Sequence, residues 1–181
     1  SHKLYGPDGL GLLYARHASQ QRLRPWQFGG EMVLDTDYQQ ARFRPAPLGF
    51  EAGTPPISAV LGFSAALDYL AKQDSVEMAA HEAVLHSALL AGLQQRADIR
   101  LLGAPQLALA SFTVAGVHGS DLAHLLSEQG ICLRNGHHCA MPLLKRLGLA
   151  GALRVSLGIY NDGEDLQRFF IALDQGLELL R

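Results

Sequence analysis

The sequence predicts an α/β protein, because strand-like and helix-like segments alternate over its last third. Its 181 residues are 48% hydrophobic, which is enough for one ordinary domain or one large part of a bigger one. Residues 1–62 differ from the rest, since glycine, proline and aromatic residues separate only short apolar runs there. We therefore expect strands and long loops in this first region and a small layered α/β domain in the last.

One or two long helices are predicted to link these regions. From Ala59 to Leu70, apolar residues recur at i, i+4, i+7, i+8 and i+11, which is the spacing of one helical face. Asp74, followed by Glu77 three residues later, is typical of the capping box that begins a helix. The predicted apolar face of this second helix consists of Val76, Ala80, Ala83, Val84, Leu89 and Leu93. Its end is expected near residue 97 or 98.

In the last third, capping and turn residues separate the apolar runs. Strands are predicted over residues 107–115, 131–134 and 153–159, and a short helix over residues 142–147. Ser120 and Asp162 are expected to cap two further helices, and Gly130 and Gly148 to end helices. This alternation is the basis for predicting a small α/β layer domain.

Composition argues against several classes of function. The formal charge is 15 − 17 = −2 and no run of basic residues occurs, so a nucleic-acid surface is not indicated. No apolar stretch approaches the ~20 residues of a membrane-spanning helix, and no signal peptide is recognisable. The two cysteines are too few for a disulfide framework. We expect a soluble protein of the reducing cytoplasm.

Cys139 is the first candidate for chemistry, because it follows an Asn-Gly turn signal and is expected to lie on a loop. His138, Arg134 and the positive end of the helix predicted next would favour the thiolate, which is the nucleophilic form. The alternative is a small buried apolar side chain, and the cationic neighbours make it the weaker interpretation. Cys132 lies inside an apolar predicted strand and is expected in the core.

A metal site is not expected, although His137, His138 and Cys139 are adjacent. Neighbouring side chains on an extended segment point to opposite faces, and the ligand spacings of zinc sites do not occur among them. The other histidines considered as ligands are His81, His86, His118 and His124.

Three further positions carry weaker signals. Lys3 lies between a histidine and a Gly/Pro-rich turn, where an amine nucleophile can be held, although a solvated lysine is the simpler interpretation. Arg154 lies in a predicted strand and either grips an anion such as a carboxylate or forms a structural salt bridge. Gly53 and Thr54 offer a backbone N–H and a hydroxyl in a turn, which could hold a phosphate.

Five segments together resemble the group II cysteine desulfurases (SufS/CsdA-like) of the aminotransferase class V family. The segments are His2-Lys3-Leu4-Tyr5-Gly6-Pro7, Gly29-Gly30-Glu31-Met32, Glu51-Ala52-Gly53-Thr54-Pro55, Arg134-Asn135-Gly136-His137-His138-Cys139-Ala140-Met141-Pro142 and Arg154-Val155-Ser156-Leu157-Gly158-Ile159-Tyr160-Asn161. Their order and spacing also fit, and the likeness runs over essentially the whole chain. The short loop around the cysteine resembles group II rather than group I.

The resemblance implies a fold and a division into domains. The fold would be type I of the pyridoxal-phosphate-dependent transferases, which is like that of aspartate aminotransferase. Residues 1–65 would be the C-terminal part of the large cofactor domain, and residues 66–181 a linking helix and the small C-terminal α/β domain. The family's chain is longer, and its N-terminal part supplies most of the cofactor pocket. We therefore expect this chain on its own to be inactive.

The resemblance also implies how the cofactor, pyridoxal 5'-phosphate, is held. Lys3 would form the Schiff base with it and transfer protons, and His2 would lie beside it. Gly53 and Thr54 would contact the phosphate of the cofactor bound mainly by the other subunit, which makes a homodimer part of the expected mechanism.

On the substrate side, the resemblance implies that Arg154, Arg134 and His138 bind the amino acid. Cys139 would attack the sulfur of L-cysteine and hold it as a persulfide while L-alanine leaves. L-selenocysteine is a second expected substrate. The sulfur would pass to an acceptor protein of the SufE/CsdE type, for iron–sulfur cluster assembly.

Two alternatives stay open at the level of sequence. One is a different enzyme of the same fold, such as a kynureninase-like relative, which would not need Cys139. The other is a non-catalytic module that carries a persulfide on Cys139 or binds a partner, without a cofactor on Lys3.

Overall fold

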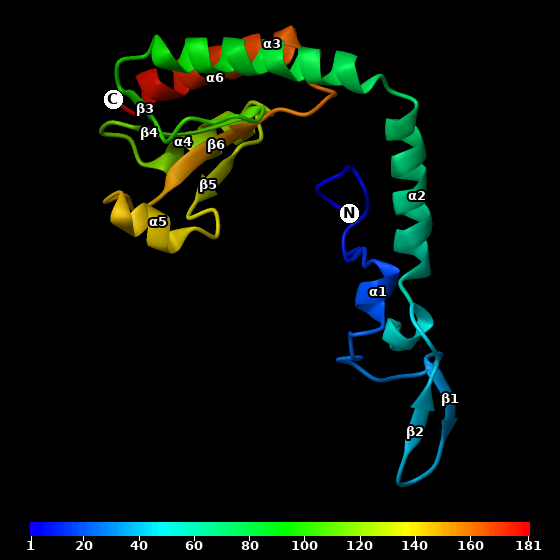
Figure 1. The fold of residues 1–181 in the computed structure, drawn as a ribbon. Helices are drawn as coiled ribbons and strands as arrows, with labels where there is room; N and C mark the ends of the chain where they lie inside the picture. The colour runs from blue at the N-terminus through cyan, green and yellow to red at the C-terminus, as the bar shows by residue number, and fades with distance from the viewer. The chain divides into compact units, whose positions relative to one another are not determined.

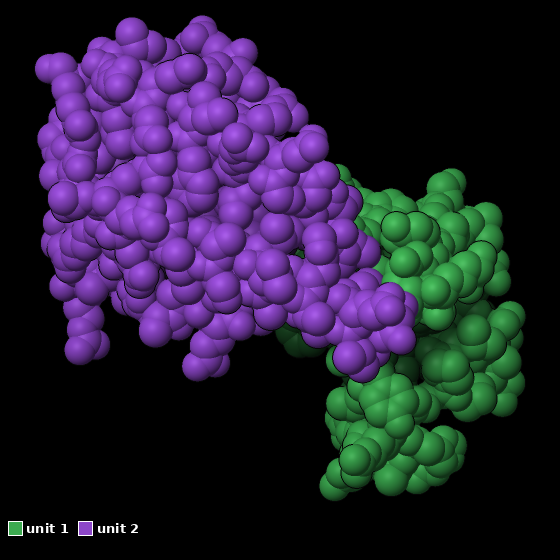
Figure 2. Space-filling model, turned by 90° about the horizontal axis from the view of Figure 1, so that it is seen from above, with its two compact units in different colours: residues 1–73 green, residues 74–181 purple.

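The computed structural model describes residues 1–181 and divides them into unit 1, residues 1–73, and unit 2, residues 74–181 (Figure 2). The boundary predicted after residue 65 falls inside helix α2 (Ile57–Ala71), which continues without interruption to its C-cap at Lys72. The assignment of the first part to a cofactor domain stays a prediction.

Unit 1 contains few regular elements, as expected from its glycine and proline content. They are α1 (His17–Gln20), β1 (Val33–Thr36), β2 (Ala41–Phe43), a 3-10 turn (Leu48–Phe50) and α2 (Figure 1). The two strands form an antiparallel hairpin. In its turn the Asp37 carboxylate accepts hydrogen bonds from the backbone N–H groups of Gln39 and Gln40, which hold the pKa of Asp37 below its ordinary value. Met32 is the buried apolar residue of this unit.

Unit 2 alternates helices and strands, so the predicted α/β layer is confirmed. Its elements are α3 (Ser75–Gln94), β3 (Ile99–Leu101), β4 (Leu109–Val114), α4 (Gly119–Glu128), β5 (Arg134–Gly136), α5 (Met141–Arg146), β6 (Ala152–Ser156) and α6 (Gly163–Leu179). The four strands form one antiparallel sheet in the order β3-β4-β6-β5.

One face of this sheet carries the core. Along β4 the residues Ala110, Phe112 and Val114 are buried, while the residues between them are only partly buried, as the two-residue period of a strand requires. Helices α3, α4 and α6 supply the other core side chains, and α3 and α6 lie side by side over the sheet (Figure 1). Ser111 on β4 and Arg154 on β6 alternate with core residues along their strands and so lie on the opposite face.

Two predicted helix caps are confirmed and one is wrong. The Asp74 carboxylate accepts from the N–H groups of Val76 and Glu77, and the Asp162 carboxylate caps α6 in the same way. The N-cap of α4 is His118 rather than Ser120. The Ser120 hydroxyl instead hydrogen-bonds His118 Nδ1 at 2.6 Å, so it serves the first turn without being the cap.

The predicted apolar face of α3 is partly wrong. Leu89 and Leu93 are buried as expected, together with Leu85, but Val76 and Val84 are 75% and 69% exposed. Residues on several sides of this helix are apolar, so periodicity alone did not identify the side that packs on the sheet. The helix also ends earlier than predicted, at Gln94.

The strand predicted over residues 131–134 begins instead at Arg134, and this corrects the placement of Cys132. Ile131 and Leu133 pack against the core, whereas Cys132, between them, is exposed. The alternation is that of an extended segment with one face inward, and the cysteine lies on its outer side. No helix is long and apolar enough to cross a membrane.

Candidate active site

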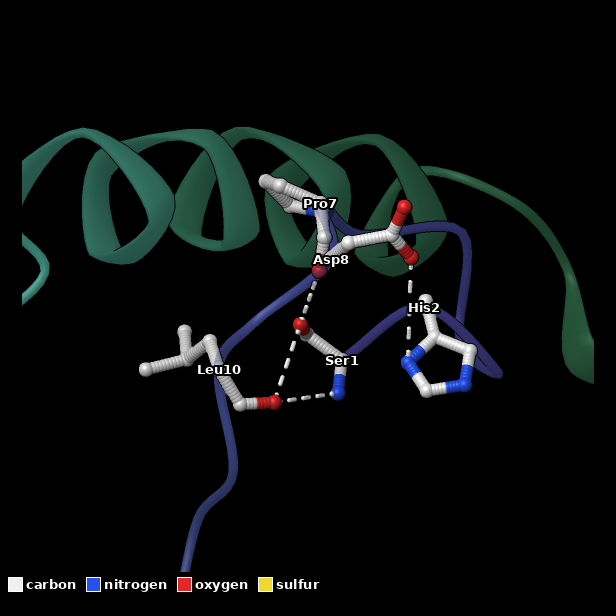
Figure 3. Close-up of polar contacts among 5 residues, drawn as sticks. All are labelled: Ser1, His2, Pro7, Asp8 and Leu10. Atoms are coloured by element: carbon white, nitrogen blue, oxygen red, sulfur yellow. Dashed lines mark hydrogen bonds and ion pairs between the residues drawn. The ribbon is translucent and has the colours of Figure 1, made fainter.

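Ser1 organises the loop that carries Lys3. Its hydroxyl hydrogen-bonds the carbonyl oxygens of Pro7 and Leu10, the second at 3.2 Å (Figure 3). Its own carbonyl oxygen accepts from the backbone N–H of Leu4 at 2.7 Å and of Gly6 at 3.1 Å. Residues 1–10 thus fold back on themselves. The turn residues that follow Ser1 are the only signal in the sequence for this arrangement.

The same loop lies directly against helix α2. A Cβ atom on Gly6 would come within 2.5 Å of the Phe63 ring, and one on Gly62 within 2.7 Å of Pro7. Such distances are too short for real atoms, so both positions need glycine. The Gly-Pro pair predicted as a turn therefore also holds the loop on the helix.

Lys3 itself is exposed and makes no hydrogen bond or ion pair within the chain. Its neighbour His2 places Nδ1 3.9 Å from a carboxylate oxygen of Asp8, with both side chains more than half exposed (Figure 3). The amine is thus held on an ordered loop and free to react with an aldehyde.

Gly53 and Thr54 have different parts in the turn predicted to hold a phosphate. The N–H of Gly53 donates to the carbonyl of Gly30 at 2.9 Å, so it is already used within the chain. A Cβ on Gly29 would lie 3.0 Å from that same nitrogen, which explains the glycine at position 29, whereas a Cβ on Gly30 would meet nothing within 4 Å. Thr54 is exposed, and its N–H and hydroxyl make no hydrogen bond within the chain. Thr54 thus has the free donors of this turn.

A row of polar side chains crosses the open face of the sheet in unit 2. Ser111 on β4 is paired with Arg154 on β6, and Arg154 with Arg134 on β5. Directly paired residues share a face and lie close together, so the two guanidinium groups repel each other. Neither arginine forms a salt bridge, and Arg154 Nε is buried without a hydrogen-bond partner. This arrangement suits a bound anion.

Cys139 lies on a tight turn beside this row. The N–H of Ala140 donates to the carbonyl of His137 at 2.8 Å, and the two residues between them, His138 and Cys139, have φ angles of 53° and 57°. The Cys139 side chain is exposed, and its Sγ lies 3.6 Å from Nη2 of Arg134. The prediction of a loop cysteine with a cationic neighbour is confirmed. The Asn-Gly pair, however, ends strand β5, and the turn follows it.

His138 points into the protein rather than outward. Its Nε2 lies 2.8 Å from the carbonyl oxygen of Ala152, and its Nδ1 is buried without a partner. Burial lowers the pKa of His138 below its ordinary value; the hydrogen bond to Ala152 opposes this, and the nearby charges of Arg154, Arg134 and His137 lower it further. The ring is thus neutral at neutral pH.

The predicted site residues form two groups. Lys3, His2, Gly53 and Thr54 lie in unit 1, and Arg134, His138, Cys139 and Arg154 lie in unit 2. The first group offers a free amine and free hydrogen-bond donors, which fit a phosphate-bearing aldehyde. The second offers a carboxylate grip and a thiol. No three histidine, cysteine or acidic side chains meet in a way that could hold a metal ion.

Comparisons with known proteins identify the family of the chain. The sequence profile of the aminotransferase class-V family matches residues 1–169. A Pseudomonas putida protein described as a probable cysteine desulfurase is 68% identical over 181 residues, which is all of this chain and 45% of its own length. The Escherichia coli cysteine desulfurase CsdA is 41% identical over 179 residues, 99% of this chain and 45% of CsdA.

A solved structure of Escherichia coli CsdA, in its S-sulfonic acid form, matches with a TM-score of 0.94 and 40% identity, and covers 99% of this chain and 45% of that one. A cysteine desulfurase from Thermococcus onnurineus matches with a TM-score of 0.89 and 29% identity, over 97% of this chain and 45% of that one. The predicted type I fold is confirmed. The chain spans about 45% of the length of these relatives.

Proposed function

Because the chain belongs to the aminotransferase class V family, we propose that it is part of a pyridoxal-phosphate-dependent cysteine desulfurase. The observation that carries this proposal is the exposed Cys139 sulfur, 3.6 Å from the Arg134 guanidinium and beside a second, unpaired arginine. A thiol next to two arginines that have no acidic partner in the chain suits a substrate that has both a carboxylate and a sulfur atom. L-Cysteine is the simplest such molecule, and L-selenocysteine has the same shape.

Arg154 and Arg134 would bind the substrate carboxylate. A carboxylate between the two guanidinium groups relieves their repulsion and gives the buried Arg154 Nε an acceptor. This grip orients the amino acid without taking part in bond breaking.

Cys139 would take the sulfur. The thiolate attacks the substrate sulfur, and a sulfur–sulfur bond forms as the carbon–sulfur bond breaks. The electron pair of the broken bond stays on the substrate carbon, which takes a proton and leaves as L-alanine. The enzyme is left with a persulfide on an exposed turn, from which an acceptor protein of the SufE/CsdE type can remove it.

Lys3, with His2 beside it, would hold and serve the cofactor, while Thr54 would bind a phosphate through its free N–H and hydroxyl. Gly53 would shape that turn, since its φ is +86°. Pyridoxal phosphate, when bound, supplies the electron sink that carbon–sulfur cleavage needs. The Lys3 amine would transfer protons to and from the substrate carbon atoms during the reaction. A homodimer and a reducing cytoplasmic setting, which keeps Cys139 as a thiol, complete the proposal.

A chimera tests the proposal. In it, this chain replaces the matching 45% of the Pseudomonas putida relative, to which it is 68% identical. With pyridoxal phosphate and L-cysteine, we expect the chimera to form L-alanine and a persulfide on Cys139. Cys139→Ser should lower alanine formation at least about 100-fold, whereas the matched Cys132→Ser should not change it.

Two results would contradict the proposal. Unchanged turnover in Cys139→Ser would indicate a relative that does not use this thiol. Borohydride reduction that leaves no pyridoxyl adduct on Lys3 of the chimera, with an adduct formed in the parent protein, would remove the cofactor role.

A further inference from the structure

The turn that carries Cys139 has an unusual backbone. Both of its central residues, His138 and Cys139, have positive φ, as in a type I′ turn, where glycine and asparagine are usual. For other residues the left-handed region costs about 1–2 kcal/mol each. No glycine occupies either position here, so contacts outside the turn must hold it in place.

One side-chain hydrogen bond ties this turn to the sheet. Strands β5 and β6 are paired up to Gly136 and Ala152, and the ladder stops there. Two residues later, His138 Nε2 reaches the carbonyl oxygen of the same Ala152 at 2.8 Å. The imidazole thus continues the attachment of the chain to β6 beyond the last backbone pair.

The chemistry of this contact determines the tautomer. A carbonyl oxygen only accepts hydrogen bonds, so Nε2 must carry the proton and Nδ1 the lone pair of the neutral ring. Nδ1 is buried and has no partner. The ring therefore has no nitrogen available to a substrate, which argues against the predicted substrate-binding role of His138.

We propose that His138 is a positioning residue whose Nε2–H, bound to the Ala152 carbonyl, locks the left-handed turn and so holds the Cys139 sulfur beside Arg134. This role rests on the proposed sulfur chemistry of Cys139. The hydrogen bond between His138 and Ala152, here called the lock, lies within unit 2 and does not depend on that chemistry. Without the lock the turn relaxes toward ordinary backbone angles, and the sulfur moves away from the two arginines.

Alkylation of Cys139 measures this position. In a Cys132→Ser background, Cys139 is the only thiol of the chain. The two guanidinium groups attract anionic iodoacetate but not neutral iodoacetamide, so the ratio of the two alkylation rates reports how near the sulfur is to the arginines. This measurement needs neither cofactor nor turnover.

Three variants separate the hydrogen bond from the backbone. His138→Asn tolerates positive φ but is too short to reach Ala152, and we expect the rate ratio to fall at least about threefold. His138→Gln keeps an N–H donor at similar reach and should restore most of the ratio. His137→Asn is the matched control, since that side chain is exposed and makes no hydrogen bond, and the ratio should not change.

An unchanged ratio in His138→Asn would overturn the proposal, as would an equal fall in all three variants. Should His138→Asn fail to fold, long-range proton–nitrogen correlation spectra of the unmutated chain decide instead. We expect His138 in the Nε2–H form at pH 7, and the Nδ1–H form would contradict the lock. Absence of alanine formation by the chimera would refute the proposed function and leave these results standing.

Discussion

The two units of this chain support their reactive groups in different ways. In unit 2, the two arginines lie on a sheet whose other face packs on buried side chains of three helices, and Cys139 lies on the turn that follows strand β5. In unit 1, Met32 is the buried apolar residue, and Leu13 and Trp26 are 86% and 91% exposed. The loop that carries Lys3 is held by hydrogen bonds of Ser1 and by the close approach of Gly6 and Pro7 to α2, while Lys3 itself makes no hydrogen bond. Unit 2, which carries the Cys139 thiol, is supported by a hydrophobic core of its own, whereas the Lys3 amine of unit 1 depends on local contacts.

The largest expected effect comes from removing core volume in each unit. Phe112→Ala leaves a cavity in a fully buried position of β4 and should lower the free energy of unfolding of unit 2 by about 3–5 kcal/mol. Met32→Ala removes a fully buried side chain of unit 1, but should leave the main cooperative transition nearly unchanged. Urea denaturation followed by circular dichroism measures both. Equal shifts of the midpoint would show that the units share one cooperative core.

An intermediate effect is expected from the arginine pair. Arg154→Met removes the repulsion with Arg134 and should leave the stability of unit 2 unchanged or higher by about 0.5 kcal/mol at low salt. Sulfate should raise the melting temperature of the unmutated chain more than that of the variant, because the anion binds between the two arginines only when the chain is folded.

Arg100→Met is the control for this experiment. Arg100 lies on the same sheet but is paired with Thr113, so neither the gain in stability nor the loss of the sulfate effect is expected. A clear loss of stability in Arg154→Met would mean that the arginine is a structural contact rather than an anion grip.

Local signals in the sequence were sufficient for many elements of unit 2. Asp74 and Asp162 cap helices through their own neighbours, and Gly130 and Gly148 end helices with φ of 77° and 70°. These features depend on residues only a few positions apart. The same holds for Cys139 on a loop near Arg134, five residues away.

Features that depend on distant pairing could not be predicted. Strand β3 is short and was missed, and the start of β5 at Arg134 is determined by its pairing with β6. The exposure of Cys132 follows from that shift. The contact of His138 with Ala152 joins residues 14 positions apart, and no pattern in the sequence predicts it.

The smallest expected effect is the pH dependence that His138 contributes. Burial lowers the pKa of His138, and the hydrogen bond to the Ala152 carbonyl opposes this. The positive charges that Arg154 on β6, Arg134 on β5 and the neighbouring His137 carry or can carry lower the pKa further. The unfolded chain therefore binds a proton at this residue at a pH where the folded chain does not. As the pH falls below about 6.5, the ordinary histidine value, this residue should lower the free energy of unfolding until the folded form is also protonated.

Urea denaturation between pH 7.5 and 5 measures this contribution as a difference between the unmutated chain and His138→Gln, since the other histidines are common to both proteins. The variant should lose less stability on acidification, and His137→Gln should behave like the unmutated chain. Parallel curves for the unmutated chain and His138→Gln would mean that the His138 ring is as free to take up a proton in the folded chain as in the unfolded one. The conclusion that a neutral, fixed His138 ring supports the Cys139 turn would then be wrong. Unit 2 would lose one of the contacts by which it supports its reactive group better than unit 1 does.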